Sequence, residues 1–565
     1  MKMKNYYIYI LITIMALLPA CNDDFLERPP LDTLTNENFW QSETHLVSAA
    51  NALYSAMNGK DVLNVFESMG EMAPWAITTA YRTIGGGNYA TDITQVNNIW
   101  VRAYYNIGRC NYFLNNYQRA VKVSDKIRER YAAEAYFFRA YDYWMLTSLF
   151  GDVPYITKEL NVYSPDVYRG RDPRQAVIDS ITSDLERTYR NLPEFIAPAS
   201  AEFGRISQGA ALTLLSRIYL YNEKWSQAAD AARRAMNLGY SLYTTGNTQN
   251  DYRNLFNFTG RASRVSANKE TILAYVYNFD LGTDARTSHN LSRELWVPND
   301  YSRFTPTKRM IETWLTADGK LWDPTSVNKY EEVFENRDPR MKQSLLPPNT
   351  PWEGRKDGNP NNTNNALFTY PKLSNDKDGC MTYSGYYIYK YVEPTKVGQV
   401  GQDDNDIIFF RYAEVLLNYV EAREQAGGIT QATLDSTINQ LRNRVGMVPL
   451  TLSNIPAGSS LRAEIRRERT VELFFEGHRY LDLIRWREAE VLGEDLLGVN
   501  RRWLDPNKLP PNILETLKWK NVNGERYLII EEGRNFNPTK HYLLSLPFTQ
   551  MQRNPNLRPN NPGWD

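Results

Sequence analysis

The stretch SQGAALTLLSRIYLYNEKWSQAADAARRAMNL, residues 207–238, decides the fold. Small and bulky apolar side chains recur in it at helical spacing, at positions Leu215, Ser216, Tyr219, Ala228, Ala232 and Ala235. Small side chains let two helices approach closely, while Leu215 and Tyr219 are large enough to fill the groove between them. Residues 222–224, Asn-Glu-Lys, supply a turn. The stretch therefore predicts two helices that pack against each other.

These offsets are those of a tetratricopeptide repeat, a helix pair that must stack with further pairs to bury a continuous core. Helical periodicity also runs through Trp100, Tyr104, Ile107, Asn111 and Leu114, and through residues 131–150, which end at a Gly-Asp-Val-Pro stop signal. A second repeat-like pair is predicted at 411–444, broken at Gly427-Gly428, and a further helix at 461–475. We therefore predict an all-α, tetratricopeptide-like helical repeat scaffold.

The chain between residues 239 and 406 has a different composition, rich in Asn, Asp, Gly, Pro and Ser. Its β-like runs, 271–275 and 386–391, predict short strands among loops, and 347–365 is expected to be an exposed excursion. The predicted organisation is a signal peptide at 1–20, an N-terminal region with helix pairs at 21–240, a loop-rich insertion at 241–405 and a C-terminal helical region at 406–565. Irregular insertions on a rigid scaffold are where binding usually occurs.

The N-terminus has the features of a secretory signal. Lys2 and Lys4 precede an apolar run, residues 6–20, that is shorter than the ~20 apolar residues of a comfortable bilayer span. Cys21 follows a small residue directly, as in a bacterial lipobox, and Asn-Asp-Asp at 22–24 resembles a surface-export signal. Acyl chains contribute ~0.8 kcal/mol per buried methylene, so acylation of Cys21 would tether the body to a membrane. An ordinary cleaved signal with a coincidental cysteine is the alternative.

Composition excludes several classes of function. The 565 residues contain 65 basic and 65 acidic side chains, so no bulk charge attracts nucleic acid. Aromatic residues reach 13%, with 38 tyrosines, which suits both a core and carbohydrate stacking. After Cys21, only Cys110 and Cys380 remain, and no CxxC spacing for zinc exists. We expect both thiols to be free, with a Cys110–Cys380 bridge as the less favoured alternative.

No motif for catalysis, metal or cofactor binding is found. The four histidines, at 45, 289, 478 and 541, form no HExxH pair, and the Gly-Gly-Gly at 85–87 matches neither a dinucleotide motif nor a P-loop. Residues 403–406, Asp-Asp-Asn-Asp, lack the other offsets of an EF-hand and are interpreted as a solvated turn. Residues 466–487 crowd Arg, Glu, His and Asp together, which permits acid–base chemistry but favours a structural ion-pair network.

Ordered blocks along the chain resemble the SusD/RagB family. They are the lipobox with its acidic residues, AYFFRAY (135–141), FGDVP (150–154), RYAEVLLNY (411–419), RRER (466–469), VELFFEGHR (471–479), DLIRW (482–486), YLLSLP (542–547) and NPNL (554–557). The resemblance implies a lipid-anchored protein on the surface of the outer membrane that binds oligosaccharides without cofactor or catalysis. It also implies a partner, a SusC-like TonB-dependent β-barrel transporter to which the cargo is delivered.

Binding a neutral sugar requires exposed aromatic rings with polar groups at their edges. Two loop-like, polar segments offer them, and in the resemblance both contribute to the glycan site. The predicted ligand-binding residues are Trp75, Tyr81, Arg82 and Tyr89, which flank a triple glycine interpreted as a flexible loop, and Trp296, Asn299 and Tyr301.

Three alternatives remain open at the level of sequence. A RagB-like member would capture peptides, using backbone hydrogen bonds more than aromatic stacking. A surface glycoside hydrolase needs two carboxylates but no short motif. A purely structural tetratricopeptide adaptor would bind no small ligand at all.

Overall fold

The computed structural model describes residues 39–57, 59–282, 286–298, 300–352, 367–374 and 379–564. The predicted signal peptide, Cys21 and the acidic residues at 22–24 lie outside the described residues. Asn299 and most of the expected excursion at 347–365 do so as well.

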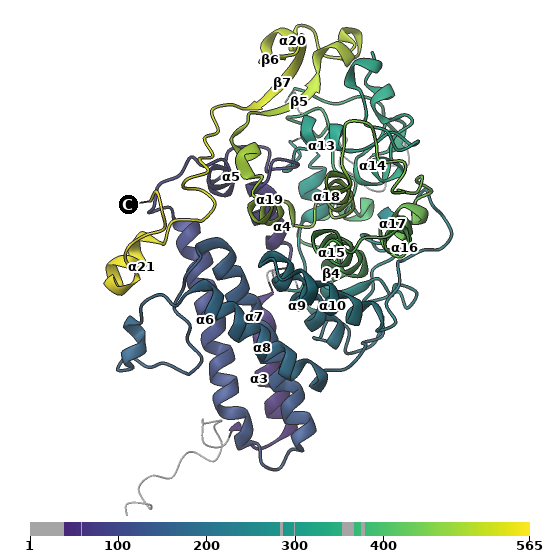
Figure 1. Cartoon of the computed structure of the whole chain (residues 1–565). Coiled ribbons are helices and arrows are strands. Elements are labelled where there is room, and N and C mark those ends of the chain that lie inside the picture. The colour runs from purple at the N-terminus through teal and green to yellow at the C-terminus, as the bar shows by residue number, and fades with distance from the viewer. Residues whose placement is uncertain are drawn as a thin grey trace, which may run out of the picture.

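Long helices fill the first half of the chain (Figure 1). They are α3 (Glu43–Leu53), α4 (Asp61–Met69), α5 (Ala80–Gly85), α6 (Thr94–Asn116), α7 (Asp125–Phe150) and α8 (Arg174–Thr188). Helix α6 packs against α7 and α7 against α8, and the apolar face predicted for α6 buries Trp100 and Ile107. Gly151 directly follows α7 with a φ of 74°, which confirms the predicted stop.

The helix pair that opened the sequence argument is confirmed. Helices α9 (Gln208–Tyr221) and α10 (Trp225–Met236) pack against each other, and Ser216, Ala228 and Ala235 between them are completely buried. The next layer comes from far along the chain, because α10 packs on α15 (Tyr412–Gln425) and α15 on α18 (Leu461–Glu472). The all-α repeat scaffold is therefore interrupted in sequence but continuous in space.

Of the second predicted helix pair, only the first helix forms as one continuous element. After α15 the chain breaks at Gly427, whose φ of 72° suits glycine, and the expected partner helix is divided into α16 (Gln431–Asp435) and α17 (Ile438–Arg444). Helix α18 ends three residues before the predicted 475, and α19 (Arg479–Trp486) and α21 (Phe548–Arg553) follow.

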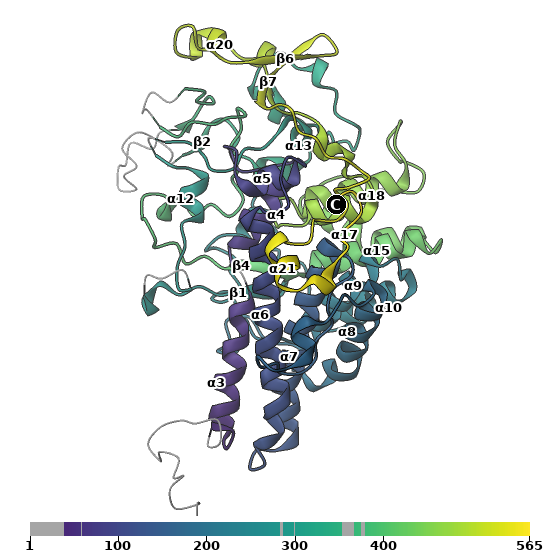
Figure 2. The same cartoon turned by 90° about the vertical axis from the view of Figure 1, so that its left-hand side faces the viewer.

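Short elements make up the insertion and the end of the molecule opposite α3 (Figures 1 and 2). Strand β1 (Thr271–Tyr275), as predicted, pairs antiparallel with β4 (Ile407–Arg411). Strands β2 (Thr350–Pro351) and β3 (Leu367–Phe368) pair, and a three-stranded sheet has the order β5 (Leu496–Asn500), β7 (Glu525–Glu531), β6 (Trp519–Val522). The short helices are α11 (Asp251–Asn254), α12 (Leu291–Leu295), α13 (Lys308–Thr313), α14 (Pro339–Ser344) and α20 (Ile513–Thr516).

Two expectations for the insertion are wrong. Residues 386–391 form no strand, only one isolated bridge between Leu345 and Ile388, because the chain turns at residues 390–391, where Tyr391 has a φ of 66°. Residues 403–406 are not a solvated turn, since all four are buried. Asp403 accepts a hydrogen bond from the Ser292 amide at 3.0 Å, and Asp406 accepts one from the Ser263 hydroxyl at 2.8 Å.

Two large cores hold the molecule together. The first is formed by the helices before residue 241 together with α15, α19 and the C-terminal tail, and the second by the insertion with parts of α18 and the β5–β7 region. Leu63 of α4 and Met72 also lie in the second core, so each core draws on segments from both halves of the chain. Cys110 lies in the first and Cys380 in the second, and both are free thiols, as the sequence favoured.

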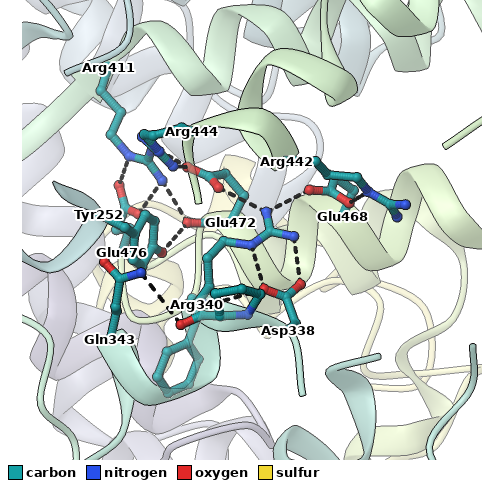
Figure 3. A network of polar contacts seen from close by, with 12 residues as sticks. Tyr252, Asp338, Arg340, Gln343, Arg411, Arg442, Arg444, Glu468, Glu472 and Glu476 are labelled. Atoms are coloured by element: carbon teal, nitrogen blue, oxygen red, sulfur yellow. Dashed lines mark hydrogen bonds and ion pairs between the residues drawn. The ribbon is translucent and has the colours of Figure 1, made fainter. Parts of the chain in front are cut away.

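A buried ion-pair network joins these segments (Figure 3). Glu472 of α18 accepts from Arg411 at 2.7 Å, Arg444 at 2.5 Å and Arg340 at 2.9 Å, which come from β4, α17 and α14. Arg411 also pairs with Glu270 at 2.8 Å and with Glu476 at 2.7 Å. The structural interpretation of the charged block at 466–487 is the one the geometry supports, since its carboxylates are engaged by arginines.

The network sets the charge state of its members. Burial alone would raise the pKa of Glu472, but Arg444, Arg411 and Arg340 outweigh burial and hold that pKa well below its usual range. The carboxylate is therefore charged, and its three partners are satisfied only while it stays in place.

We predict that Glu472→Ala lowers the free energy of unfolding by ~3–5 kcal/mol, because it leaves three buried guanidinium groups without their common carboxylate. Denaturant unfolding followed by circular dichroism measures the change.

Glu488→Ala is the matched control. Glu488 pairs with Arg466, but its side chain is 50% exposed, so its removal should cost only about 0–1 kcal/mol. Equal denaturation midpoints for Glu472→Ala and the parent would contradict the role assigned to the network.

Candidate functional site

Two loop segments that are far apart in sequence meet beside α5. The amide of Ala76 donates to the Arg303 carbonyl at 2.7 Å, and the amide of Thr305 donates to the Pro74 carbonyl at 3.0 Å. The rings of Trp75 and Phe304 meet edge to face, with centroids 5.0 Å apart. The structure thus brings Trp75 into the neighbourhood of Tyr301, as expected if both predicted segments serve one site.

Tyr301 carries polar neighbours around its ring. The Arg303 guanidinium lies over that ring at 4.1 Å and pairs with Asp300 at 2.8 Å. Tyr383 approaches Tyr301 edge on, with centroids 5.5 Å apart. All five of these residues are half-buried, and we call the group the aromatic platform: Trp75, Asp300, Tyr301, Arg303 and Tyr383.

The platform can bind without reacting. Partly exposed rings can stack on the apolar face of a sugar, while Arg303 can donate and Asp300 can accept hydrogen bonds beside them. Asp300 is the one carboxylate of the platform, and Arg303 already engages it, so the group lacks the carboxylate pair that glycoside hydrolysis requires.

Trp296 was predicted to contact ligand, and this prediction is wrong. Its side chain is 0% exposed, its indole nitrogen donates to the Ile388 carbonyl at 2.9 Å, and its ring stacks on Tyr389. A ring with no accessible face cannot stack on a sugar. The prediction failed because the burial comes from Ile388 and Tyr389, which lie about ninety residues away in sequence and leave no local signal.

Arg82 was predicted to bind ligand, and this prediction also fails. It is 1% exposed, pairs with Glu531 at 2.7 Å, and donates to the carbonyls of Trp75, Ala76 and Ile530. Because its donors are engaged by protein groups, Arg82 has a structural role beside the platform. Its two bonds to the backbone at Trp75 and Ala76 fix the loop that carries the platform tryptophan.

The triple glycine is not a flexible loop. Gly85 ends α5, and a Cβ there would lie 2.1 Å from the Met69 carbonyl oxygen. A Cβ on Gly87 would lie 2.5 Å from the Asn535 carbonyl oxygen, and the φ of Gly87 is 80°. These glycines permit close backbone contact with α4 and the C-terminal tail.

The other two predicted aromatics lie apart from the platform contacts. Tyr89 packs on Trp564 with centroids 4.7 Å apart, and burial raises the pKa of its phenol well above the ordinary value. Burial also raises the pKa of Tyr81, and the charges that act on that phenol are Asp61 and Arg102. Both side chains are half-buried, so their part in binding stays a prediction.

Sequence reasoning missed Asp300, Arg303 and Tyr383. Tyr383 follows the same pattern that singled out Tyr301, an aromatic residue among Thr, Ser and Gly in a loop-like stretch. Arg303 was missed because an arginine two residues after a tyrosine does not by itself indicate that the guanidinium lies over the ring.

Two features of the described chain bear on chemistry: the histidine of the charged block and the grouping of metal-ligating side chains. His478 is buried, and burial lowers its pKa well below the ordinary value. No three His, Cys, Asp or Glu side chains in the described ranges gather closely enough to hold a metal ion. None of the helices described is long and apolar enough to cross a bilayer.

The scaffold defines a helical-repeat protein, and the platform places partly exposed aromatic rings where its loops meet. The chain belongs to the SusD family, whose model matches residues 269–564, more than half of its length. A second family model, described as starch-binding associating with outer membrane, matches residues 24–220. The resemblance drawn from the sequence blocks is confirmed, and neither description is that of an enzyme family.

Relatives extend over the whole chain. SusD-like protein P2 of Formosa agariphila is 26% identical over 582 residues, covering 100% of both chains. A SusD-like carbohydrate-binding protein of Bacteroides fragilis has a similar structure, with a TM-score of 0.77, 25% identity, and coverage of 92% of this chain and 100% of that one. Surface glycan-binding protein A of Bacteroides uniformis shares the fold, with a TM-score of 0.62, 18% identity, and coverage of 92% and 99%.

We predict that Gly85→Ala destabilises the protein by about 1–3 kcal/mol, because its Cβ would press against the α4 backbone beneath the platform. Thermal or denaturant unfolding measures the effect.

Gly108→Ala is the matched control on another helix. Nothing lies within 4 Å of a Cβ there, so alanine should stabilise α6 by roughly 0.5–1 kcal/mol. Similar stabilities for the two variants would show that the space beside Gly85 is not restrictive.

Proposed function

We propose that the protein captures oligosaccharides at the surface of the outer membrane and delivers them to a SusC-like TonB-dependent transporter. The observation that carries this proposal is the aromatic platform. Its rings, those of Trp75, Tyr301 and Tyr383, come from three segments of the chain, its one arginine lies over the ring of Tyr301, and its one carboxylate pairs with that arginine.

Capture in this proposal is passive. Sugar rings stack on Trp75 and Tyr301, and ligand hydroxyls exchange water for Arg303 and Asp300. Because Arg82 and the Phe304 contact hold the Trp75 loop, little ordering is required when the ligand binds. Tethering near the transporter would then make transfer effectively intramolecular.

Anchoring in this proposal depends on Cys21. Acylation of its thiol would hold the body on the outer membrane, which agrees with the wording of the N-terminal family model. We also propose that the protein has no enzymatic activity. Release of reducing ends from a polysaccharide would reveal a hydrolase, and tight binding of peptides without any saccharide response would favour the peptide-capturing alternative.

We predict that Trp75→Ala and Tyr301→Ala each weaken oligosaccharide binding by roughly tenfold, since aromatic contacts contribute ~0.5–1.5 kcal/mol beyond the area they bury. Calorimetry against neutral oligosaccharide and peptide panels measures the loss.

Tyr163→Ala is the control, because Tyr163 is an exposed tyrosine, 91% accessible, on the loop between α7 and α8. It should bind as the parent does. Unchanged affinity in both platform variants would place the ligand elsewhere and remove the main support for the proposal.

We predict that Cys21→Ala releases the protein from the outer-membrane fraction and abolishes incorporation of labelled fatty acid, because the thiol to be acylated is gone. Cys380→Ala is the control, since that thiol is buried and should not affect anchoring. Continued membrane association and labelling of Cys21→Ala would contradict the anchor.

A further inference from the structure

A cleft separate from the aromatic platform opens on the side of α6 that faces β1. It has a volume of about 830 Å³ and lies between α3, α6, the turn before α9 and the end of β1. Its walls include Asn51, Tyr54, Arg102, Arg109, Arg205 and Tyr275. None of these residues belongs to the aromatic platform.

The charge of this cleft is strongly one-sided. Four guanidinium groups line it, from Arg102, Arg109, Arg205 and Arg286, whereas Asp61 is the one carboxylate among its described lining residues. Behind Arg102, burial raises the pKa of Asp142 well above the ordinary value, which favours its uncharged form. Since the chain as a whole is neutral, the cleft is a local concentration of positive charge.

Two of the four arginines are uncommitted. Arg205 is held in place by both oxygens of the buried Glu134, at 3.2 and 2.8 Å. Arg109 donates to the neutral Ser55 hydroxyl, and Arg102, two turns earlier on the same helix, is exposed. Neither Arg102 nor Arg109 pairs with a carboxylate anywhere in the described ranges. Their charge is therefore available to a ligand.

Helix geometry spaces these two groups. Arg102 and Arg109 lie seven residues apart on α6, which is two turns, so they lie on one face about 10 Å apart. A guanidinium group binds carboxylate or sulfate through two parallel hydrogen bonds. In a saccharide chain, acid groups on every second sugar are separated by about the same distance as these two guanidinium groups.

An aromatic wall completes the cleft. Tyr275 is the last residue of β1, and Tyr277 lies two residues further on, with the two ring centroids 4.6 Å apart. Tyr275 is half-buried at the cleft surface. Rings beside uncommitted arginines recognise a ligand that has both apolar sugar faces and acid groups.

We infer that this cleft binds acidic saccharides, chains that carry carboxylate or sulfate groups, through Arg102 and Arg109 with Tyr275 as a stacking surface. The inference deepens the proposed function, on which it rests, by naming the class of glycan. Contacts link the two sites: Tyr277 accepts from the Lys60 amide, Lys60 pairs with Glu294, and the Glu294 carbonyl accepts from the Arg303 amide of the platform.

The test compares the parent with Arg102→Gln/Arg109→Gln by calorimetry. The probes are hexagalacturonate, its carboxyl-reduced neutral counterpart, and a kappa-carrageenan hexasaccharide, which carries sulfate groups on alternate sugars and no carboxylate. The parent should prefer an acidic probe, and the double variant should lose about tenfold or more in affinity for it, since hydrogen bonds to charged groups are the strong ones. It should also lose most of the salt dependence of binding. Preference for the uronate or for the sulfate identifies the acid group.

Arg526→Gln is the matched control, an exposed arginine of β7 at the far end of the molecule. It should leave binding of every probe unchanged, and a loss equal to that of the double variant would overturn the cleft as the site. Binding of neutral sugar that needs Trp75, with no preference for acidic probes, would leave the proposed function standing and refute this inference. Failure of all saccharides to bind the folded parent would refute both.

Discussion

The position of Glu472 constrains the rest of the structure. A carboxylate removed from water is tolerated only when it is paired and hydrogen-bonded, and Glu472 obtains this from arginines on β4, α17 and α14. Strand β4 and helix α17 belong to the C-terminal region, whereas α14 lies in the insertion. Arg411 extends the constraint to Glu270, which directly precedes β1. The insertion is therefore fixed to the helical scaffold by charge as well as by apolar packing, and its loops can carry a site.

A chain of close contacts connects that network to the platform. Glu476 pairs with Arg411, and the next amide, that of Gly477, donates to Glu67 of α4 at 2.7 Å. The end of α4 packs directly on Gly85 of α5, where no side chain would fit. From α5, Arg82 reaches the backbone at Trp75. The Trp75 loop is thus held through its backbone and through buried charge, while the Trp75 side chain stays partly exposed.

Much of the scaffold could be predicted from sequence, because helical periodicity and small-residue spacing are local patterns, as α6, α7, α9 and α10 illustrate. The failures share one physical cause. The polar run at 403–406 and the aromatic run at 386–391 are buried by partners far along the chain, and no local pattern reports that burial. The same cause explains the candidate site. From sequence alone, Trp296 and Arg82 were as plausible as ligand-binding residues as Trp75 and Tyr301. In the structure Trp75 and Tyr301 are half-exposed, whereas Trp296 and Arg82 are enclosed.

The division between framework and binding residues also explains what family membership can say about ligand. The framework charges are buried and mutually satisfied, so a change in one is felt by several partners, and the fold persists in relatives at 25% identity with a TM-score of 0.77. The platform residues, and Arg102, Arg109 and Tyr275 of the cleft, are at least partly exposed and lie outside that network, so they can change without cost to it. The ligand of a member must therefore be inferred from its own exposed rings and uncommitted charges. In this chain those are the rings near Arg303 and the guanidinium pair on α6.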